Sequence, residues 1–268
     1  MTYQALEEGT ESGRPVETYK FTIGSTVYRY TSAPFDHQPP YDSNDYFSRA
    51  ISRTSAKQTT EDRRTPLEIT LPTDDALAQR FIDVPPGPEV TLEITRYHIG
   101  DTEAYVIWSG RIIGAAYLQE GGVCTLSGVT DEAAFSRSIP RFKYQGLCNH
   151  VLYDTLCTVA RASFKYTGTV SAVVGNTITV SGLSAKGADW AVGGYVDNGA
   201  SDYRLVVSQS GDILTLFLPF ETSPLGSSVD VYAGCNHTID VCTSKFSNAV
   251  NYGGFPFVPT FNPFDRGL

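Results

Sequence analysis

Four of the five cysteines in this chain lie in two matched segments, and cysteine thiolates can bind metals. Cys148 and Cys157 enclose "CNHVLYDTLC", and Cys235 and Cys242 enclose "CNHTIDVC". The tripeptide Cys-Asn-His therefore occurs twice, and a second cysteine follows each time within ten residues. Buried cysteines commonly do nothing except pack. The repeated pattern is hard to attribute to packing alone and indicates joint binding of one metal or cluster.

The spacing of the cysteines bears on which metal they would hold. Eight residues separate Cys148 from Cys157, six separate Cys235 from Cys242, and 77 lie between the two pairs. Zinc ribbons usually place about two to four residues between paired cysteines, because a tight turn points both sulfurs at one ion. Cys148 and Cys157 can share a site only if the chain turns between them, since residues nine apart lie on opposite faces of a helix. An iron–sulfur cluster, which is larger than one ion, is mildly favoured, and zinc stays open.

The histidines next to the cysteines suggest no catalytic site. His150 and His237 each follow a cysteine by two residues, and we expect them to donate hydrogen bonds or to pack rather than to ligate. A Cys–His hydrolase is disfavoured, because a histidine so close in sequence rarely meets the sulfur in a usable geometry. No G-x-S-x-G, HExxH or P-loop pattern is present, so no catalytic residue is predicted and the chain is not expected to be an enzyme. Cys124 lies alone in an expected strand and is predicted to be a core residue.

The composition describes a globular, β-rich chain. Sixteen Tyr, fourteen Phe and 24 Gly favour strands with many turns. The formal net charge of −9 argues against a specific nucleic-acid-binding surface. No stretch approaches the roughly 20 apolar residues that span a bilayer, and the first residues lack the features of a signal peptide, so no membrane anchor is expected. We therefore expect folding in a reducing cytoplasm, where a disulfide framework does not form.

The first half of the chain reads as an antiparallel β domain, residues 1–140. A hairpin is predicted in "VETYKFTIGSTVYRY", with its turn at Gly24 and Ser25. A helix is predicted over residues 73–84, capped by Thr73 or Asp74. Further strands are expected in four segments: "PLEITL", "EVTLEITRY", "AYVIWSGRII" and "VCTLSGV".

The second half, residues 141–268, is predicted to be a domain stapled by its cysteines. A small β module, about residues 166–233, lies between the two cysteine pairs, so a joint site would close the module at its base. A module of this size has a marginal core of its own, which the staple would compensate. The tail, residues 246–268, is rich in aromatic residues and proline, and it either forms a docking surface or packs on its own domain.

The segments "YQGLCNHVLYDTLC" and "GCNHTIDVCTSKFSNAVNYGGFPFVPTFNP" resemble the tail-tip (baseplate) hub proteins of long-tailed bacteriophages. This family includes the minor tail protein L of lambda-like phages and the hub of gene transfer agents. The first half, from "VETYKFTIGSTVYRYTS" through "SGRIIGA" to "SRSIPRF", is also similar to the family's hub domain. The resemblance implies a structural 4Fe–4S cluster held by four residues: Cys148, Cys157, Cys235 and Cys242.

The resemblance also implies a place in the virion. It suggests a homotrimeric hub ring at the tail tip, between the distal tail protein ring and the central tip or fibre protein, assembled in the cytoplasm of the bacterial host. Two alternatives are a zinc-stapled structural protein and a β-sandwich module that binds a host surface glycan or protein. The second alternative would use "ADWAVGGYVDNG", around Trp190 and Tyr195, as a recognition loop.

Overall fold

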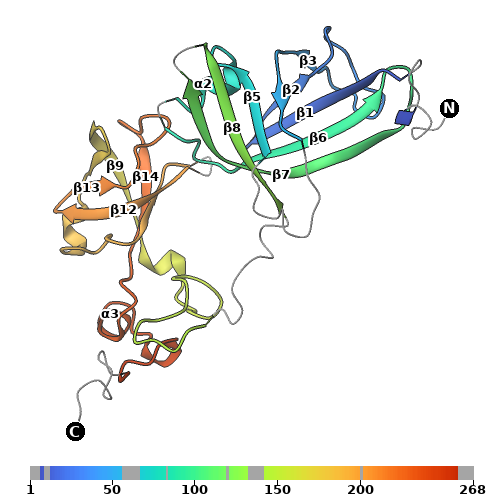
Figure 1. Cartoon of the computed structure of the whole chain (residues 1–268). Coiled ribbons are helices and arrows are strands. Elements are labelled where there is room, and N and C mark those ends of the chain that lie inside the picture. The colour runs from blue at the N-terminus through green and yellow to red at the C-terminus, as the bar shows by residue number, and fades with distance from the viewer. Residues whose placement is uncertain are drawn as a thin grey trace, which may run out of the picture. The chain divides into compact units, whose positions relative to one another are not determined.

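The chain divides into two units, which a computed structural model describes in detail (Figure 1). The units are Met1–Ser136 and Arg137–Leu268. The described residues are 7–8, 13–55, 67–82, 84–118, 121–131, 142–199 and 202–258. The predicted boundary at residue 140 lies outside them. In the described part of the chain, no helix is long and apolar enough to cross a membrane.

The first unit is built on one eight-stranded sheet with the strand order β3-β2-β1-β6-β7-β8-β5-β4. Neighbouring strands are antiparallel except β2 and β3, which are parallel. The predicted hairpin is confirmed, with its turn at Gly24 and Ser25. The strands are β1 (Pro15–Ile23), β2 (Thr26–Thr31), β3 (Phe47–Ser48), β4 (Ser52–Arg53), β5 (Leu67–Pro72), β6 (Val90–His98), β7 (Ala104–Leu118) and β8 (Val123–Thr130).

The two edges of this sheet are linked by a very short connection. Only residues 49–51 join β3 to β4, although these strands lie at opposite ends of the strand order. The four steps from Ser48 to Ser52 span at most about 14 Å, so the sheet must curl to bring its edges together. Arg53 of β4 then reaches Glu17 of β1 and donates from Nε and Nη2 at 2.8 and 2.6 Å. The edges are also only two residues long, which leaves little backbone free to pair with another chain.

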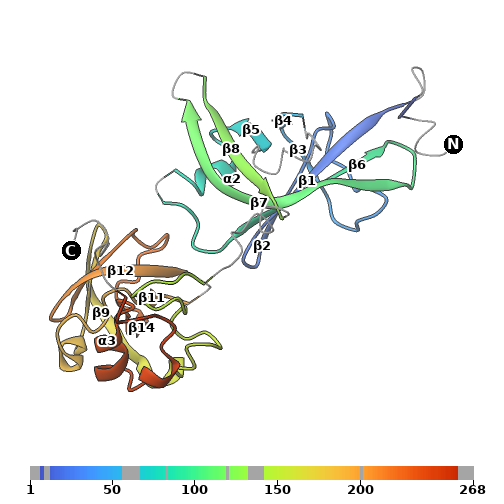
Figure 2. The ribbon, with the colours of Figure 1, turned by 60° about the horizontal axis from the view of Figure 1, so that its bottom comes forward.

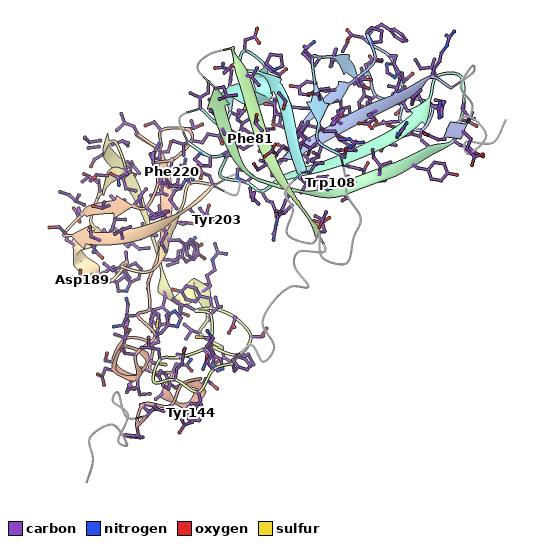
Figure 3. The ribbon with its side chains drawn as sticks, viewed as in Figure 1. Phe81, Trp108, Tyr144, Asp189, Tyr203 and Phe220 are labelled. Atoms are coloured by element: carbon purple, nitrogen blue, oxygen red, sulfur yellow. The ribbon has the colours of Figure 1, made fainter. Side chains whose placement is uncertain are left out.

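The inner face of the curled sheet holds the core of the first unit. Alternate residues of the strands are buried, as in β5, where Leu67, Ile69 and Leu71 point inward. Trp108 of β7 packs in this core (Figure 3), and a Cβ atom at Gly110 or Gly128 would lie within 3 Å of its ring. Those two glycines therefore make room for the indole. Cys124 is fully buried in the same core, as predicted.

The predicted helix over residues 73–84 is wrong in length and in its cap. The observed helix, α2, covers only Ala76–Gln79, and Asp75 caps it by accepting the Leu77 N–H at 2.8 Å. After α2 the backbone N–H groups of residues 80–82 bond to carbonyls three residues back instead of four, so the α-helix ends before the chain reaches the prolines at positions 85, 86 and 88. Of the apolar residues that suggested a longer helix, Leu77 lies in α2 and is fully buried.

The β module in the second unit is a closed barrel of six antiparallel strands in the order β10-β13-β12-β11-β14-β9. We call residues 165–232 the barrel. Its interior is filled by side chains, among them Leu183 from the short 3₁₀ helix η4 (Leu183–Lys186). Closure removes all sheet edges, so the β-sandwich alternative does not match the architecture. The strands are β9 (Lys165–Val174), β10 (Thr177–Val180), β11 (Tyr195–Asp197), β12 (Tyr203–Ser210), β13 (Ile213–Leu216) and β14 (Ser228–Tyr232).

The rest of the described second unit is almost without regular structure. We call residues 142–164 and 233–258 the cysteine loops. They contain one helix, α3 (Ile239–Ser244), and two 3₁₀ turns, η3 (Arg161–Phe164) and η5 (Ala249–Asn251). The first loop leads into β9 and the second leaves β14, and these two strands pair with each other. The barrel therefore brings the two cysteine loops together at one end (Figures 1 and 2).

Candidate metal centre

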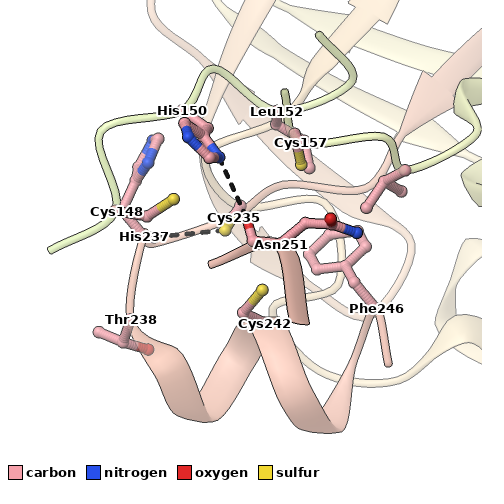
Figure 4. A pocket seen from close by; sticks show the side chains of 11 residues that line it. Cys148, His150, Leu152, Cys157, Cys235, His237, Thr238, Cys242, Phe246 and Asn251 are labelled. Atoms are coloured by element: carbon pink, nitrogen blue, oxygen red, sulfur yellow. Dashed lines mark hydrogen bonds between the residues drawn. The ribbon is translucent and has the colours of Figure 1, made fainter. Parts of the chain in front are cut away.

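Cys148, Cys157, Cys235 and Cys242 line one cavity between the cysteine loops. Figure 4 shows their sulfur atoms turned toward the same space. The cavity is small and is otherwise lined by Leu152, Val159, Phe246 and a few polar residues. The structure thus brings together the two pairs that the sequence separates by 77 residues. We call this space the sulfur cavity.

The two Cys-Asn-His segments contact each other directly. The Cys148 N–H donates to the carbonyl of His237 at 2.9 Å. The His237 N–H in turn donates to Cys235 Sγ at 3.3 Å, and His237 has a φ of 62°. A left-handed backbone is costly for a residue other than glycine and tends to occur at functional sites. The repeated tripeptide is therefore a pair of interlocking loops at one site.

The loop between Cys148 and Cys157 turns around the carboxylate of Asp154. This carboxylate accepts the N–H groups of Cys157, Leu156 and Val151 at 2.6, 3.0 and 3.3 Å. The same hydrogen bonds, that from Cys157 foremost, hold the pKa of Asp154 below its usual value. Nothing in the sequence analysis singled out Asp154. An aspartate three residues before a predicted ligand was the available signal, because it can cap the turn that carries the ligand.

Cys242 is carried by α3, whose start is capped by Thr238. The Thr238 hydroxyl accepts the Val241 N–H at 3.4 Å, and Asn236 accepts the Thr238 N–H at 3.0 Å. Cys242 lies in the second turn and is 8% exposed. The asparagine of the second Cys-Asn-His segment therefore orders the helix that presents the last thiol to the cavity.

Cys235 is held by close backbone packing at the exit from the barrel. A Cβ atom at Gly234 would lie 1.9 Å from the Val192 carbonyl, and one at Gly194 would lie 2.1 Å from the Tyr232 carbonyl. The ammonium of Lys245 donates to the Gly234 carbonyl at 2.8 Å and also contacts the Trp190 carbonyl. Glycine at both positions lets the two backbone segments touch, and this contact fixes the position of the backbone at Cys235.

Burial raises the pKa of Cys235 and Cys242, and the neighbouring thiols raise it further. The hydrogen bond from the His237 N–H acts in the opposite direction on Cys235. The bare site therefore disfavours ionisation of Cys235 and Cys242. A bound cation reverses this, because coordinating thiols lose their protons. The donor set therefore fits a metal group that carries positive charge.

The arrangement of the thiols bears on the choice between zinc and a cluster. In the described residues, no three His, Cys, Asp or Glu side chains are close enough to hold one metal ion. A tetrahedral zinc site has Zn–S bonds of about 2.3 Å and needs its sulfurs within about 4 Å of one another. In the described residues the thiols are therefore not arranged as a closed single-ion site.

His150 and His237 both line the cavity, and both make hydrogen bonds to other parts of the cysteine loops. His150 Nδ1 lies 3.0 Å from the carbonyl oxygen of Asn251, within hydrogen-bond distance. His237 acts through its backbone, as described above. The other two histidines, His37 and His98, lie in the first unit, where His98 is buried and His37 contacts Tyr97.

The tail packs on its own unit as far as residue 258. Phe246 is buried against Phe164, with ring centroids 4.7 Å apart. The rings of Phe255 and Tyr144 are 4.2 Å apart. Val250 and Phe257 are almost fully exposed, at 97% and 95%. Part of residues 246–258 thus packs on its own unit, while the stretch around Val250 and residues 255–257 stays exposed. Residues 259–268 lie outside the described part.

The aromatic residues of the alternative recognition loop are engaged within the unit. Trp190 is half-buried against both the barrel core and the cysteine loops, and its carbonyl contacts Lys245. Tyr195 stacks on Tyr232 with ring centroids 4.7 Å apart, and the guanidinium of Arg161 lies over both rings. These side chains join the barrel to the cysteine loops, which leaves less of them for a ligand.

Comparisons with known proteins relate the chain to phage proteins. Residues 195–262 match the family described as phage conserved hypothetical protein BR0599, a segment that includes Cys235 and Cys242. An uncharacterized protein of Xylella fastidiosa (strain 9a5c) is 25% identical over 186 residues, which are 64% of this chain. The chain spans only 38% of that relative's length.

A solved structure matches the whole chain. It is a chain of the structure titled "Virion of native gene transfer agent (GTA) particle", with a TM-score of 0.74 and 16% identity. The match covers 100% of this chain and 95% of that one. The fold is therefore shared over its full length with a component of a virion. The expected relation to phage proteins is confirmed at this level.

Proposed function

We propose that this protein is a hub component of a phage-type tail tip or baseplate, with a structural 4Fe–4S cluster held by Cys148, Cys157, Cys235 and Cys242. The observation that carries the proposal is the convergence of four thiols from two distant segments on one cavity. The full-length fold match to a chain of a gene transfer agent virion supports the assembly role. In that role the protein forms a ring, a homotrimer, between the distal tail ring and the central tip or fibre protein.

The cluster would act as a staple rather than as a redox catalyst. Binding free energy at a site that is not preformed in the unfolded chain adds to folding free energy. Here the staple would join the segment that enters the barrel to the segment that leaves it. The protein's own residues provide four sulfurs, capped loops and an apolar rim that limits access of water.

The cofactor part is tested by purifying the full chain without oxygen and measuring its absorption, iron and acid-labile sulfide. We expect a brown protein, bleached by dithionite, with iron and sulfide in equal amounts. A colourless protein that carries one zinc would overturn the cluster and favour the zinc-stapled alternative. Protein with neither metal would overturn the cofactor part altogether.

The assembly part is tested in particles of the host that encodes the chain. A small tag on the protein should be labelled by gold-conjugated antibody at the tail tip in electron micrographs. Particles made without the protein should lack a complete tip. Labelling on the head, or tips that are complete without the protein, would contradict the hub role.

A further inference from the structure

The residues that follow α3 contact Cys157 and Cys242, which are the second cysteine of each pair. The side-chain amide of Asn248 donates to the Cys157 carbonyl, and its Nδ2 lies 3.9 Å from Cys157 Sγ. The Asn248 N–H donates to the Cys242 carbonyl at 3.0 Å, and Cys242 Sγ lies 3.3 Å from the Asn248 carbonyl oxygen. One asparagine therefore connects Cys157 to Cys242, although 84 residues lie between these two cysteines.

The same segment reaches a third cysteine through Gly253. The Gly253 N–H donates to Cys148 Sγ at 3.3 Å. Its carbonyl accepts the Asn149 N–H at 3.1 Å and the Asn149 side-chain amide at 2.8 Å. A Cβ atom at position 253 would lie 2.4 Å from His150 Nε2. Glycine is thus the residue that lets the backbone come close enough to place a donor on the sulfur.

Asn251 holds the Asn248 side chain in the required orientation. Its Nδ2 donates to the Asn248 side-chain oxygen at 2.7 Å and to the Thr158 hydroxyl at 2.9 Å. Because the Asn248 oxygen is occupied in this way, its N–H groups face Cys157. The carbonyl of Asn251 lies 3.0 Å from His150 Nδ1, a hydrogen bond that ties the segment to the first cysteine loop.

We propose that residues 248–253 form a strap that positions three of the four ligand sulfurs and controls how tightly the cluster is retained and at what potential it is reduced. The inference rests on the proposed function, because it concerns the group held in the same cavity. Hydrogen bonds to ligand sulfurs draw off negative charge and favour the reduced state. Partners that orient metal ligands are typically worth about 10–100-fold in metal affinity. Asn248 and Gly253 are positioning residues in this scheme.

The first experiment compares two identical chemical changes in the iron-loaded full chain. Asn248→Asp removes the amide donor near Cys157. Asn236→Asp adds the same charge earlier in the same loop and keeps the side-chain oxygen that accepts the Thr238 N–H. We expect Asn248→Asp to release iron to a chelator about ten-fold faster than wild type and to lower the midpoint potential. Asn236→Asp should change both values much less.

The second experiment tests Gly253 by steric block and relief. Gly253→Ala should release iron about ten-fold faster, because the new methyl group collides with His150. The double variant Gly253→Ala with His150→Ala removes the obstacle and should recover part of the retention, since it also removes the hydrogen bond between His150 and Asn251. Gly146→Ala is the matched control, since a Cβ there meets its nearest atom, the Phe255 carbonyl oxygen, only at 3.8 Å.

The outcomes separate the strap from the proposed function. If wild-type protein holds iron and sulfide but Asn248→Asp behaves like Asn236→Asp in both iron release and potential, the strap proposal is overturned and the cluster stands. A Gly253→Ala variant that the His150→Ala change fails to restore also contradicts it. If wild-type protein holds neither iron nor sulfide, the cofactor part of the proposed function fails and the strap proposal falls with it.

Discussion

The barrel buries twelve apolar residues in one cluster, whereas the cysteine loops bury three in theirs: Val159, Ala233 and Phe246. The barrel is closed by continuous strand pairing, but the loops hold one helix of six residues. Four of the five non-glycine residues with positive φ in the described chain lie in the loops: Tyr153, Thr158, His237 and Ser247. Neighbouring parts of one unit therefore differ in what can hold them together.

The comparison shows where the folding free energy of each part comes from. Apolar burial contributes roughly 25 cal/mol per Å², so a filled barrel can fold on its own contacts. The cysteine loops have little such burial and carry strained backbone, which costs about 1–3 kcal/mol per residue. They need another source of stability, and the proposed cluster would supply it. The loops are then the part of this unit that depends on the metal.

The largest expected effect comes from removing a ligand. Cys235→Ser should abolish stable iron binding and release the cysteine loops, with the barrel still folded, because structural metal sites contribute on the order of 10 kcal/mol. Hydrogen-exchange mass spectrometry should show lost protection over residues 142–164 and 233–258, and retained protection over 165–232. Cys124→Ala, in the core of the first unit, is the control and should leave the iron content unchanged. Equal loss of protection in the barrel and in the loops would contradict the idea that only the loops depend on the metal.

A change in the barrel core should instead destabilise the barrel itself. Leu214 is fully buried there, and Leu214→Ala should destabilise the barrel by about 2–5 kcal/mol through the cavity it leaves. The loops should unfold with it, since β14 delivers the chain to Cys235. Denaturation followed by Trp190 fluorescence in a Trp108→Phe background measures this.

The control for the barrel is Leu205→Ala. Leu205 lies on the outer face of β12 and is 51% exposed, so its loss should cost less than about 0.5 kcal/mol. If both leucine variants lose the same stability, the barrel interior is not what holds this part together.

A smaller effect is expected for the capped turn in the first cysteine loop. Asp154→Ala removes the acceptor of three backbone N–H groups and should cost about 1 kcal/mol, as lost caps do. Iron should dissociate faster while the barrel midpoint stays constant. Thr155→Ala, at the exposed neighbour, should change neither value. Unchanged iron release in Asp154→Ala would show that the turn does not depend on this carboxylate.

The smallest predicted effect concerns the first unit and pH. Burial alone would raise the pKa of Glu17, but hydrogen bonds from Arg53 and Tyr19 hold it below its usual value. The ionised carboxylate therefore stabilises the first unit above the unfolded pKa of about 4.3, and this contribution is lost as the pH falls through the folded pKa. Glu17→Gln should lower stability at neutral pH by about 1 kcal/mol and flatten its acid dependence.

The stability of the Glu17→Gln variant is measured by denaturation followed by Trp108 fluorescence in a Trp190→Phe background, between about pH 6 and pH 2. Glu68→Gln, at an exposed position of β5, serves as the control. If the stability of Glu17→Gln falls with acid in the same way as that of wild type, the ionised Glu17 carboxylate does not stabilise the first unit. Iron content should not differ between these variants, because the change lies in the other unit.

Much of the fold followed from patterns in the sequence. Alternation in "VETYKFTIGSTVYRY" and "PLEITL" predicted strands that the structure contains, since one side of each strand must be buried. The helix over residues 73–84 was wrong in length, because the backbone tightens to three-residue hydrogen bonds directly after Gln79. The second β module was predicted as strands and turns, but not as a closed barrel. Closure depends on pairing β9 with β14, which are distant in the sequence.

The sequence by itself determined which residue types are available for a metal centre: two matched cysteine pairs, separated by a module of strands. It also indicated that the chain must turn between Cys148 and Cys157. Only the tertiary structure decided that the four thiols share one cavity, because the barrel's closing strands bring the two loops to the same end. The supporting contacts of Asp154, Asn248 and Gly253 were likewise decided there. Hydrogen bonds between residues 105 positions apart leave no local pattern in a single sequence.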